Sequence, residues 1–360
     1  MTCMYSALKL KTGEIEALLE SERLVVDSIV PIFDVARPSS KTSIEKRLES
    51  SLSLIRKAWP KQSKEFYLDL RDLPLELRLA NGIHPAYRLA SDLVYHGSKV
   101  TLCFGFDRDS PYEDAISNVV LRSPITNVAL RLQLPDLKLL DDTVDKSRGF
   151  LGRVGRTFET STVFLDLECI DGATDDLSAI VERAYIRFRK LGVTRIVLLA
   201  TGMWDWSKLQ SRTITRVPRE EIKLWEQLRK KGIAVSYGDY GVISPSFIDP
   251  EFRFNSPPTP KLRYATMNHW LIAKGEKPQK GENSQYPGLA QSLMSNSEFR
   301  QNDLDWGHDR IRDLASYDVR TIGSARAVAI GTSIHLDITA KNIAYLERQF
   351  AGDAGLVEML

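Results

Sequence analysis

Apolar and polar positions along this chain follow two rhythms, one of period two and one close to 3.6 residues. The segment 29–36, IVPIFDVA, is a short apolar run typical of a buried strand. Residues 43–59 follow it, with Ile44, Leu48 and Ile55 spaced to share one face of a helix. A strand followed by an amphipathic helix is the repeating unit of a parallel sheet.

The same unit recurs along most of the chain. Further strands are predicted at 65–70, 99–106, 127–134, 161–168, 194–201, 233–241 and 263–275, and further helices at 85–97, 110–120, 174–192 and 217–232. Eight such units over roughly 250 residues favour a (β/α)8 barrel of the TIM type, in the α/β class. An open doubly wound sheet is the alternative, but FDVARPSS after the first strand lacks the glycine-rich turn of a dinucleotide-binding fold.

We predict a single barrel domain over residues 1–360, with the core barrel at about 29–275. Residues 1–28 are expected to form an N-terminal extension with a short strand and helix, and 276–360 a C-terminal extension in which SARAVAIGT looks like a strand. The link 135–160 is weakly patterned. The segment 242–262 has five prolines and no periodicity, so we expect a long loop at the top of the barrel.

Three predicted strands, YLDLR (67–71), ALRLQL (129–134) and FLDLE (164–168), alternate leucine with polar residues. Side chains alternate across a strand, so the leucines are expected to face the helices and the polar residues the barrel interior. The inward set is Asp69, Arg71, Arg131, Gln133, Asp166 and Glu168, with Asp34 added after the first strand. These groups either neutralise one another in an internal network or form a ligand or metal site.

If they form a site, its catalytic residues are expected to be Asp69, Asp166, Glu168 and Asp239, the last from the strand 233–241. All lie near the carboxyl ends of their strands, where barrel enzymes place their chemistry. Asp166 and Glu168 are the candidates to hold a metal, and a carboxylate-rich site suits Mg²⁺ or Mn²⁺ better than Zn²⁺. The sequence has no HExxH, CxxC, Walker or GxSxG motif.

A different kind of site is suggested by TGMWDWSKLQSR (201–212), where Trp204 and Trp206 follow a strand. Two exposed tryptophans would form a stacking platform for a base, a sugar or a protein partner. Packing beneath the proline-rich loop is the alternative. We therefore assign both tryptophans to a candidate partner surface.

Composition excludes some classes of function. The 360 residues carry 49 Lys and Arg against 47 Asp and Glu, and the net charge of +2 argues against a nucleic-acid binder. The three cysteines are too few and scattered for a disulfide framework or a zinc knuckle. No apolar run reaches membrane-spanning length and the N-terminus does not look like a signal peptide, so we expect a cytoplasmic protein without a membrane partner.

Several short motifs resemble the "beta protein" family of phages and bacteria. They are MYSALKLKTGEIEAL, IVPIFDV, YGDYG with SP close behind, RYATMNHWLIAKG and GTSIHLDI, and they run from about residue 4 to 345. The family occurs in phages and in mobile elements, so the resemblance implies a role there and no particular reaction. Its recurring positions map onto Lys9, Lys11, Glu14, Asp239, Tyr240, Arg263, Tyr264, Trp270, Lys274 and His335.

Two hypotheses follow. In the first, the barrel is a scaffold for recognition of a phage or host protein in phage–host conflict, either antiphage defence or counter-defence, through the tryptophan surface. In the second, it is a metal-assisted hydrolase or transferase acting on a nucleotide or other phosphoester, with its acidic site at the barrel mouth. The expected ligand-binding residues are Lys9, Lys11, Arg71, Arg131, Arg263, Tyr264 and Lys274. The missing catalytic motif favours recognition.

Overall fold

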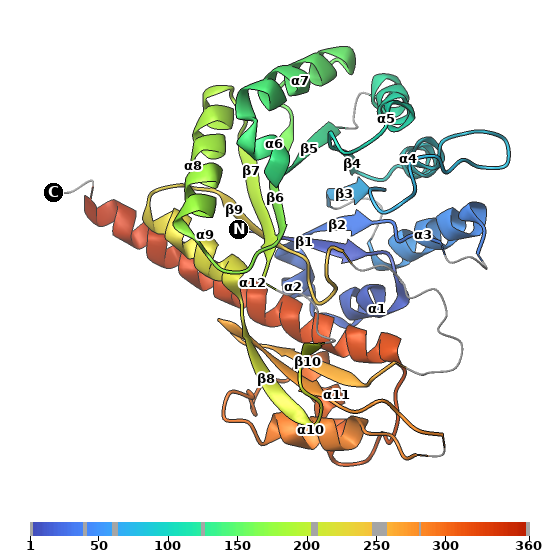
Figure 1. The fold of residues 1–360 in the computed structure, drawn as a ribbon, viewed down its shortest axis with the longest axis vertical. Helices are drawn as coiled ribbons and strands as arrows, with labels where there is room; N and C mark the ends of the chain where they lie inside the picture. The colour runs from blue at the N-terminus through green and yellow to red at the C-terminus, as the bar shows by residue number, and fades with distance from the viewer. Residues whose placement is uncertain are drawn as a thin grey trace.

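The computed structural model describes residues 3–38, 42–59, 64–123, 127–202, 208–246, 258–280 and 282–357. Within these ranges, eight parallel strands close into a barrel in the order β1-β2-β3-β4-β5-β6-β7-β9 (Figure 1). Helices lie between successive strands and cover the outside of the barrel. The predicted (β/α)8 barrel is therefore confirmed.

The barrel begins earlier in the chain than the sequence suggested. Its strands are β1 (Met4–Lys9), β2 (Ile29–Asp34), β3 (Phe66–Asp69), β4 (Val100–Phe104), β5 (Asn127–Gln133), β6 (Thr162–Cys169), β7 (Arg195–Thr201) and β9 (Ser236–Asp239). β1 pairs in parallel with both β2 and β9, so the prediction of an extension before residue 29 was wrong. All six residues of β1 are buried, because both faces of a closed barrel strand are covered.

The outer helices are α1 (Thr12–Glu20), α2 (Arg23–Asp27), α3 (Ile44–Ala58), α4 (Pro85–Tyr95), α5 (Ser110–Arg122), α6 (Leu134–Lys138), α7 (Leu140–Arg153), α8 (Asp175–Lys190) and α9 (Glu220–Lys230). In α3, the Ser43 side chain caps the first turn by accepting a hydrogen bond from the backbone N–H of Lys46. The link 135–160 is more ordered than its pattern indicated. Its buried Leu140, Val144 and Leu151 form a helical stripe among many charges.

A second lobe lies beside the barrel (Figure 1). It consists of β8 (Thr213–Pro218), β10 (Lys261–Ala265), β11 (His269–Lys274), α10 (Tyr286–Met294) and α11 (Trp306–Ala315). In the described ranges its sheet has three antiparallel strands in the order β10-β11-β8. β8 leaves the barrel after β7, and the chain returns through α9 to β9.

The assignment of 263–275 as the eighth barrel strand was wrong, because these residues form the β10–β11 hairpin. A turn splits the segment: the N–H of Thr266 donates to the carbonyl of His269 at 2.8 Å, and the Thr266 hydroxyl accepts from the N–H of His269 at 3.1 Å. The barrel strands therefore run from Met4 to Asp239 rather than over 29–275.

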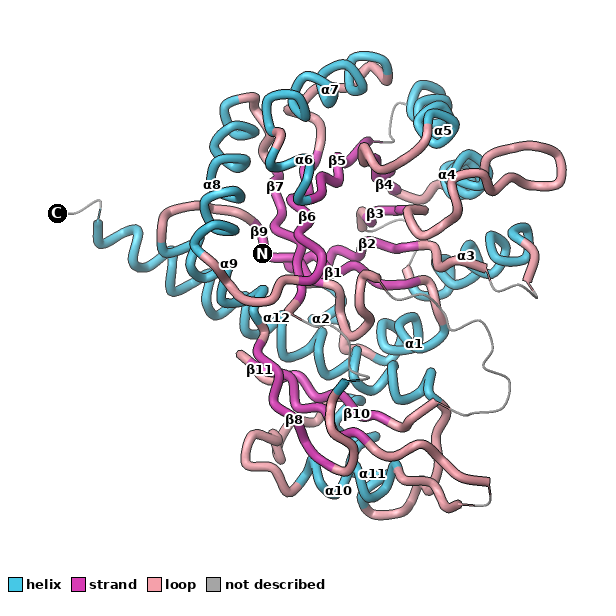
Figure 2. The backbone as a smooth tube through the Cα atoms, in the orientation of Figure 1, coloured by secondary structure: helices cyan, strands magenta, loops and turns pink. Residues whose placement is uncertain are grey.

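The helix α12 (Ser324–Val357) lies between the barrel and the second lobe (Figure 2). Its Leu336, Ala340 and Ile343 join the core under the barrel helices, whereas Ile330 and Ile334 join the core of the second lobe. The prediction of a strand over 324–332 was wrong, because these residues belong to α12. A helix that is covered on both sides has apolar residues all round and shows no 3.6-residue pattern. Among the described residues, no helix is both long and apolar enough to cross a membrane.

Gly13, in the first turn of α1, allows that helix to pack directly on α12. A Cβ at this position would lie 2.4 Å from the carbonyl oxygen of Ala325 and 3.1 Å from Val328. We expect Gly13→Ala to lower the free energy of unfolding by about 1–3 kcal/mol, because one of the helices must shift. Denaturant titration measures the change.

The matched control is Gly149→Ala in α7, where a Cβ would meet only the Nη1 of Arg153, at an ordinary 3.6 Å. This substitution is expected to be neutral or to stabilise by up to about 1 kcal/mol, since alanine favours the helix. Equal stability of the two variants would contradict the close packing of α1 on α12.

Candidate functional site

The inward-pointing polar residues form one layer at the carboxyl-terminal end of the barrel. Asp34, Asp69 and Asp166 extend from β2, β3 and β6, and Arg131 extends from β5; each is at most 1% exposed. The leucines that alternate with them face the helices and belong to the outer core. The side-chain directions predicted from the alternating strands are therefore correct for this layer.

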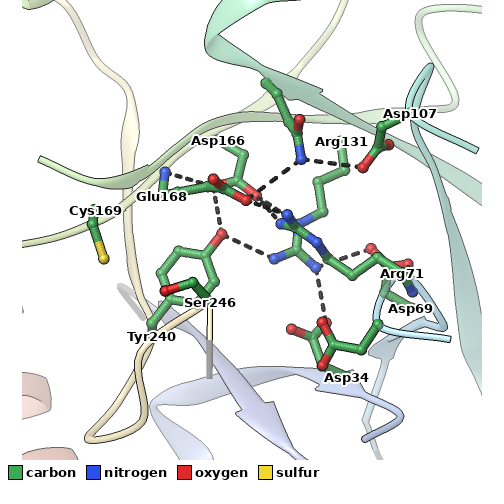
Figure 3. A network of polar contacts seen from close by, with 12 residues as sticks. Asp34, Asp69, Arg71, Asp107, Arg131, Asp166, Glu168, Cys169, Tyr240 and Ser246 are labelled. Atoms are coloured by element: carbon green, nitrogen blue, oxygen red, sulfur yellow. Dashed lines mark hydrogen bonds and ion pairs between the residues drawn. The ribbon is translucent and has the colours of Figure 1, made fainter. Parts of the chain in front are cut away.

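Arg131 lies at the centre of the layer (Figure 3). Its Nη1 donates to Asp34 at 2.8 Å and to Asp69 at 2.9 Å, and its Nε donates to Asp166 at 2.8 Å. Its Nη2 donates to the hydroxyl of Tyr240 at 3.0 Å, and that hydroxyl donates to Asp166. One guanidinium group thus links five separate segments of the barrel.

Arg108 and Lys9 also pair with these acids. Arg108, in the loop after β4, donates to both carboxylate oxygens of Asp69 at 2.8 and 2.9 Å. The Nζ of Lys9 lies 3.3 Å from Asp34 and 2.6 Å from Asp72. Bidentate and charge-assisted contacts of this kind are the strong ones, so these acids are firmly held.

These contacts fix the charge of the layer. Burial would raise the pKa of Asp34, but Arg131 and Lys9 outweigh it and hold the pKa at about 2. Burial would lower the pKa of Arg131, but Asp34, Asp166 and other neighbours raise it well above its ordinary value. Asp34 and Arg131 are therefore both charged at neutral pH, and the acids of the layer pair with Arg131 in an internal network, the first of the two sequence-based alternatives.

Glu168 differs from the buried acids, because its side chain is 42% exposed. Its backbone has φ 55°, in the left-handed region, and the β6–β7 pairing shifts register between Asp166 and Glu168. Its carboxylate pairs with Arg71, which also donates to Asp166 at 3.1 Å. A strained non-glycine residue at a bulge is a recurrent feature of functional sites.

A cleft of about 460 Å³, called the mouth cleft below, opens beside Glu168 at this end of the barrel. Its lining includes the cations Lys11, Arg37 and Arg71 and the acid Asp107. The rim therefore carries both signs of charge. Such a lining suits a polar ligand or a protein segment of mixed charge better than a ligand with a strong charge of a single sign.

Gln133 also points toward the mouth, as predicted. Its Nε2 donates to Asp107 at 3.1 Å. The sequence analysis missed Arg108, and its position directly after a strand end, in FGFDRD, was the available signal.

Asp239 was predicted to lie with the other acids, and this prediction was wrong. The inward position of this segment belongs to Tyr240, so the preceding residue points outward. Asp239 accepts a hydrogen bond from Ser6 at 2.9 Å and lies 2.9 Å from Nε2 of His335 in α12. Burial would raise the pKa of Asp239, but His335 and Arg219 outweigh it and hold the pKa at about 2. Asp239 therefore joins the barrel to α12.

Arg263, Tyr264 and Lys274 were predicted at the barrel mouth, and this too was wrong, because they belong to β10 and β11 of the second lobe. The Tyr264 hydroxyl lies 3.0 Å from Nε2 of His308 inside that lobe. The Nζ of Lys274 donates to the carbonyl of Leu209. Arg263 lines a separate cavity. Trp204 and Trp206 lie outside the described residues.

The buried acids are a poor fit for a divalent cation. One oxygen of Asp166 accepts from Tyr240 and from the backbone N–H of Glu168, and the other accepts from Arg71 and Arg131. A metal bound there would have to displace an arginine. Glu168 is the accessible carboxylate of the predicted pair.

Elsewhere in the described ranges, Asp303, Asp305 and His308 have the spacing of metal ligands. Asp305 accepts from the backbone N–H groups of Gly307 and His308 and so caps α11. It also holds the His308 ring. The contacts of Asp305 and His308 are therefore explained by the capping of α11 inside the second lobe.

The fold and the mouth together define a (β/α)8-barrel protein with a polar, internally paired layer beneath a solvent-facing cleft. The chain belongs to the Beta protein family, whose family model matches residues 5–340. The family resemblance noted in the sequence is thereby confirmed. No curated protein matches the chain.

Solved structures similar to this chain include the catalytic domain of a hyperthermophilic chitinase from Pyrococcus furiosus. That match has 9% identity, covers 67% of this chain and 84% of that one, and has a TM-score of 0.38. A second is triosephosphate isomerase from Bartonella henselae, with 12% identity, coverage of 66% of this chain and 91% of that one, and a TM-score of 0.33.

Proposed function

We propose that this protein is a recognition protein that acts in phage–host conflict and that its barrel is a rigid scaffold. The observation that carries the proposal is the closure of the acidic layer. Asp34, Asp69 and Asp166 would have to be open for acid–base or metal chemistry, but each is at most 1% exposed and each is bound by Arg131. Membership of the Beta protein family supports the proposed setting.

In this proposal, the partner is a protein of phage or host origin. The partner surface includes Trp204 and Trp206, which follow β7 in the sequence. Tryptophan supplies large buried area at small entropic cost and is enriched among residues that dominate binding. The mouth cleft adds polar contacts, because its lining includes the cations Lys11 and Arg37 and the acid Asp107.

Glu168 favours a second candidate, a hydrolase or transferase acting on a phosphoester with Mg²⁺ or Mn²⁺. It is strained, exposed and placed in a cleft at the carboxyl ends of the barrel strands. In this candidate Glu168 would contact the metal or act as a base, and Arg71 would bind the anionic substrate. The candidate needs no contribution from the buried aspartates.

One experiment separates the two candidates. The gene is expressed in a bacterial host, and a panel of phages is plated on cells with wild type, the Trp204→Ala/Trp206→Ala variant or Glu168→Gln. We expect the wild-type protein to change plaque counts at least tenfold for some phage. The tryptophan variant is expected to lose this effect, and Glu168→Gln to keep it.

Loss of the effect in Glu168→Gln with retention in the tryptophan variant would favour the phosphoester enzyme instead. Unchanged plaque counts for every phage with the wild-type protein would contradict a role in phage–host conflict. Circular dichroism of each purified variant checks that the fold is intact.

A further inference from the structure

A second cavity, of about 630 Å³, lies between the first turns of α1 and α12, α3 and β10. Lys11 belongs to its lining and to that of the mouth cleft. Its walls are apolar at Leu54, Ile243 and Val328 and aromatic at Tyr286. The volume is in the range of small-molecule binding sites, which are mostly apolar with a few placed polar groups.

Polar atoms without partners gather on this lining. Both carboxylate oxygens of Glu14, the Nε of Arg47 and the Nε of Arg263 are buried and have no hydrogen-bond partner in the part of the chain that the structure describes. Glu14 is 0% exposed. Folded proteins pair nearly all such atoms, so a group from outside the chain is expected to meet these ones.

The charge of the lining is positive. It includes the cations Lys11, Arg47, Lys261 and Arg263 and the acid Glu14. Burial raises the pKa of Glu14 to about 8, against the opposing effect of Lys9 and Lys11, so the carboxyl carries its proton at neutral pH. With Glu14 neutral, the charged groups that remain on the lining are cations, and a positive lining favours an anion.

The start of α12 adds to this preference. Ser324 and Ala325, at the N-terminus of this 34-residue helix, belong to the lining. The first N–H groups of a helix have no partner within it and present the positive end of its dipole, which stabilises phosphate and carboxylate groups. The helix start and the unpaired arginine atoms are independent observations that favour the same kind of ligand.

Three residues of the lining, Glu14, Arg263 and Tyr286, have a different character. Arg263 is close enough to Tyr286 and Glu14 for both to raise its pKa, although burial, the larger influence, lowers it to about 10. A protonated carboxyl both donates and accepts a hydrogen bond. The Glu14 carboxyl lines the same cavity as the Tyr286 ring and the apolar wall. Together these groups suit a flat ring with hydrogen-bond donors and acceptors on its edge, such as a nucleobase.

We propose that this cavity binds a nucleoside phosphate. The phosphate lies against Arg47, Lys261 and the start of α12, and the base lies beside Tyr286 with its edge at Glu14 and Arg263. The site is distinct from the mouth cleft, although Lys11 lines both, and the proposal does not depend on the role in recognition.

Isothermal titration calorimetry of the full chain tests the proposal. The probes are AMP, GMP, UMP, ATP and GTP, with adenosine, guanosine, uridine and inorganic phosphate as partial ligands. We expect at least one nucleoside phosphate to bind at least tenfold more tightly than its nucleoside and than inorganic phosphate. Absence of binding by all five nucleotides at millimolar concentration would overturn the proposal, as would equally tight binding of inorganic phosphate.

Variants locate the site. Arg47→Ala is expected to weaken nucleotide binding about tenfold, and Leu54→Trp, which fills the cavity, is expected to abolish it. Arg56→Ala is the matched control, because Arg56 is an exposed arginine of the same helix outside the lining. Arg37→Ala, on the lining of the mouth cleft, is also expected to leave binding unchanged. Weakening by Arg37→Ala but not by Arg47→Ala would assign the nucleotide to the mouth and overturn the proposal.

Discussion

Arg131→Met is expected to lower the free energy of unfolding by about 3–5 kcal/mol at pH 7, because removing one partner of a buried ion pair leaves uncompensated buried charge. Three carboxylates, those of Asp34, Asp69 and Asp166, lose a hydrogen-bond donor at once. A typical domain is stable by only about 5–15 kcal/mol, so the variant should be close to its unfolding midpoint under mild denaturant. Urea titration followed by circular dichroism measures the loss.

The loss should shrink as the pH falls. In the wild-type protein, Asp34 has a folded pKa of about 2, below its ordinary value of 3.8, so its contribution to stability is present above pH 3.8 and is lost as pH falls through 2. Without Arg131, Asp34 should instead take up a proton at a higher pH, because burial is the largest influence on its pKa and raises it. The difference in stability between the variant and the wild type should therefore be smaller at pH 4 than at pH 7, and smallest near pH 2, where the wild-type contribution of Asp34 is also lost.

Arg153→Met is the control for Arg131→Met. Arg153 pairs with Glu113 on the surface, and its side chain is 60% exposed. An exposed pair of this kind contributes at most about 1 kcal/mol. A loss below 1 kcal/mol for Arg131→Met as well would contradict the central role of Arg131 in the barrel.

Glu14→Gln is expected to stabilise the protein at alkaline pH by several kcal/mol. Burial raises the folded pKa of Glu14 from 4.5 to about 8, so the wild-type protein has the full benefit of the neutral carboxyl below pH 4.5 and loses it as pH rises through 8. Integrated over that interval, the linkage amounts to at most about 5 kcal/mol. Lys9 and Lys11 favour the charged form and Asp34 opposes it, but burial is the largest influence.

Urea titrations at pH 5 and pH 9 test this prediction. Glu14→Gln and the wild-type protein should agree within about 1 kcal/mol at pH 5 and differ by about 2–5 kcal/mol at pH 9. Glu20→Gln, at the exposed end of the same helix, is the control and should stay within about 0.5 kcal/mol of the wild type at both values. Equal stabilities at pH 9 would mean that Glu14 ionises without penalty.

The barrel was predictable because each of its units carries its own local signal. An apolar run such as 29–36 and a helix with Ile44, Leu48 and Ile55 on one face need no distant information. The place of β1 in the barrel was harder to predict, because Lys9, in a strand near the start of the chain, looks like an exposed edge residue. Its burial becomes evident only when Asp34 and Asp72 are placed around its ammonium group.

The site was partly predictable for the same reason. Strict alternation on β3, β5 and β6 predicted the inward direction of Asp69, Arg131 and Asp166. It did not predict Asp239, because a displacement of one residue along a strand moves a side chain to the other face. The cavity lined by Glu14, Arg47 and Arg263 is formed by three distant parts of the chain. Local periodicity does not indicate which distant segments come together in space.

The position of α12 has a consequence for the order of folding during synthesis. The helix contacts β1, and its His335 reaches Asp239 on β9, so it covers the seam where the first and last barrel strands meet. Both strands leave the ribosome well before α12 does. The nascent barrel therefore has an uncovered apolar seam until residues beyond 324 have emerged, and this interval is when the chain is most exposed to aggregation and to chaperones.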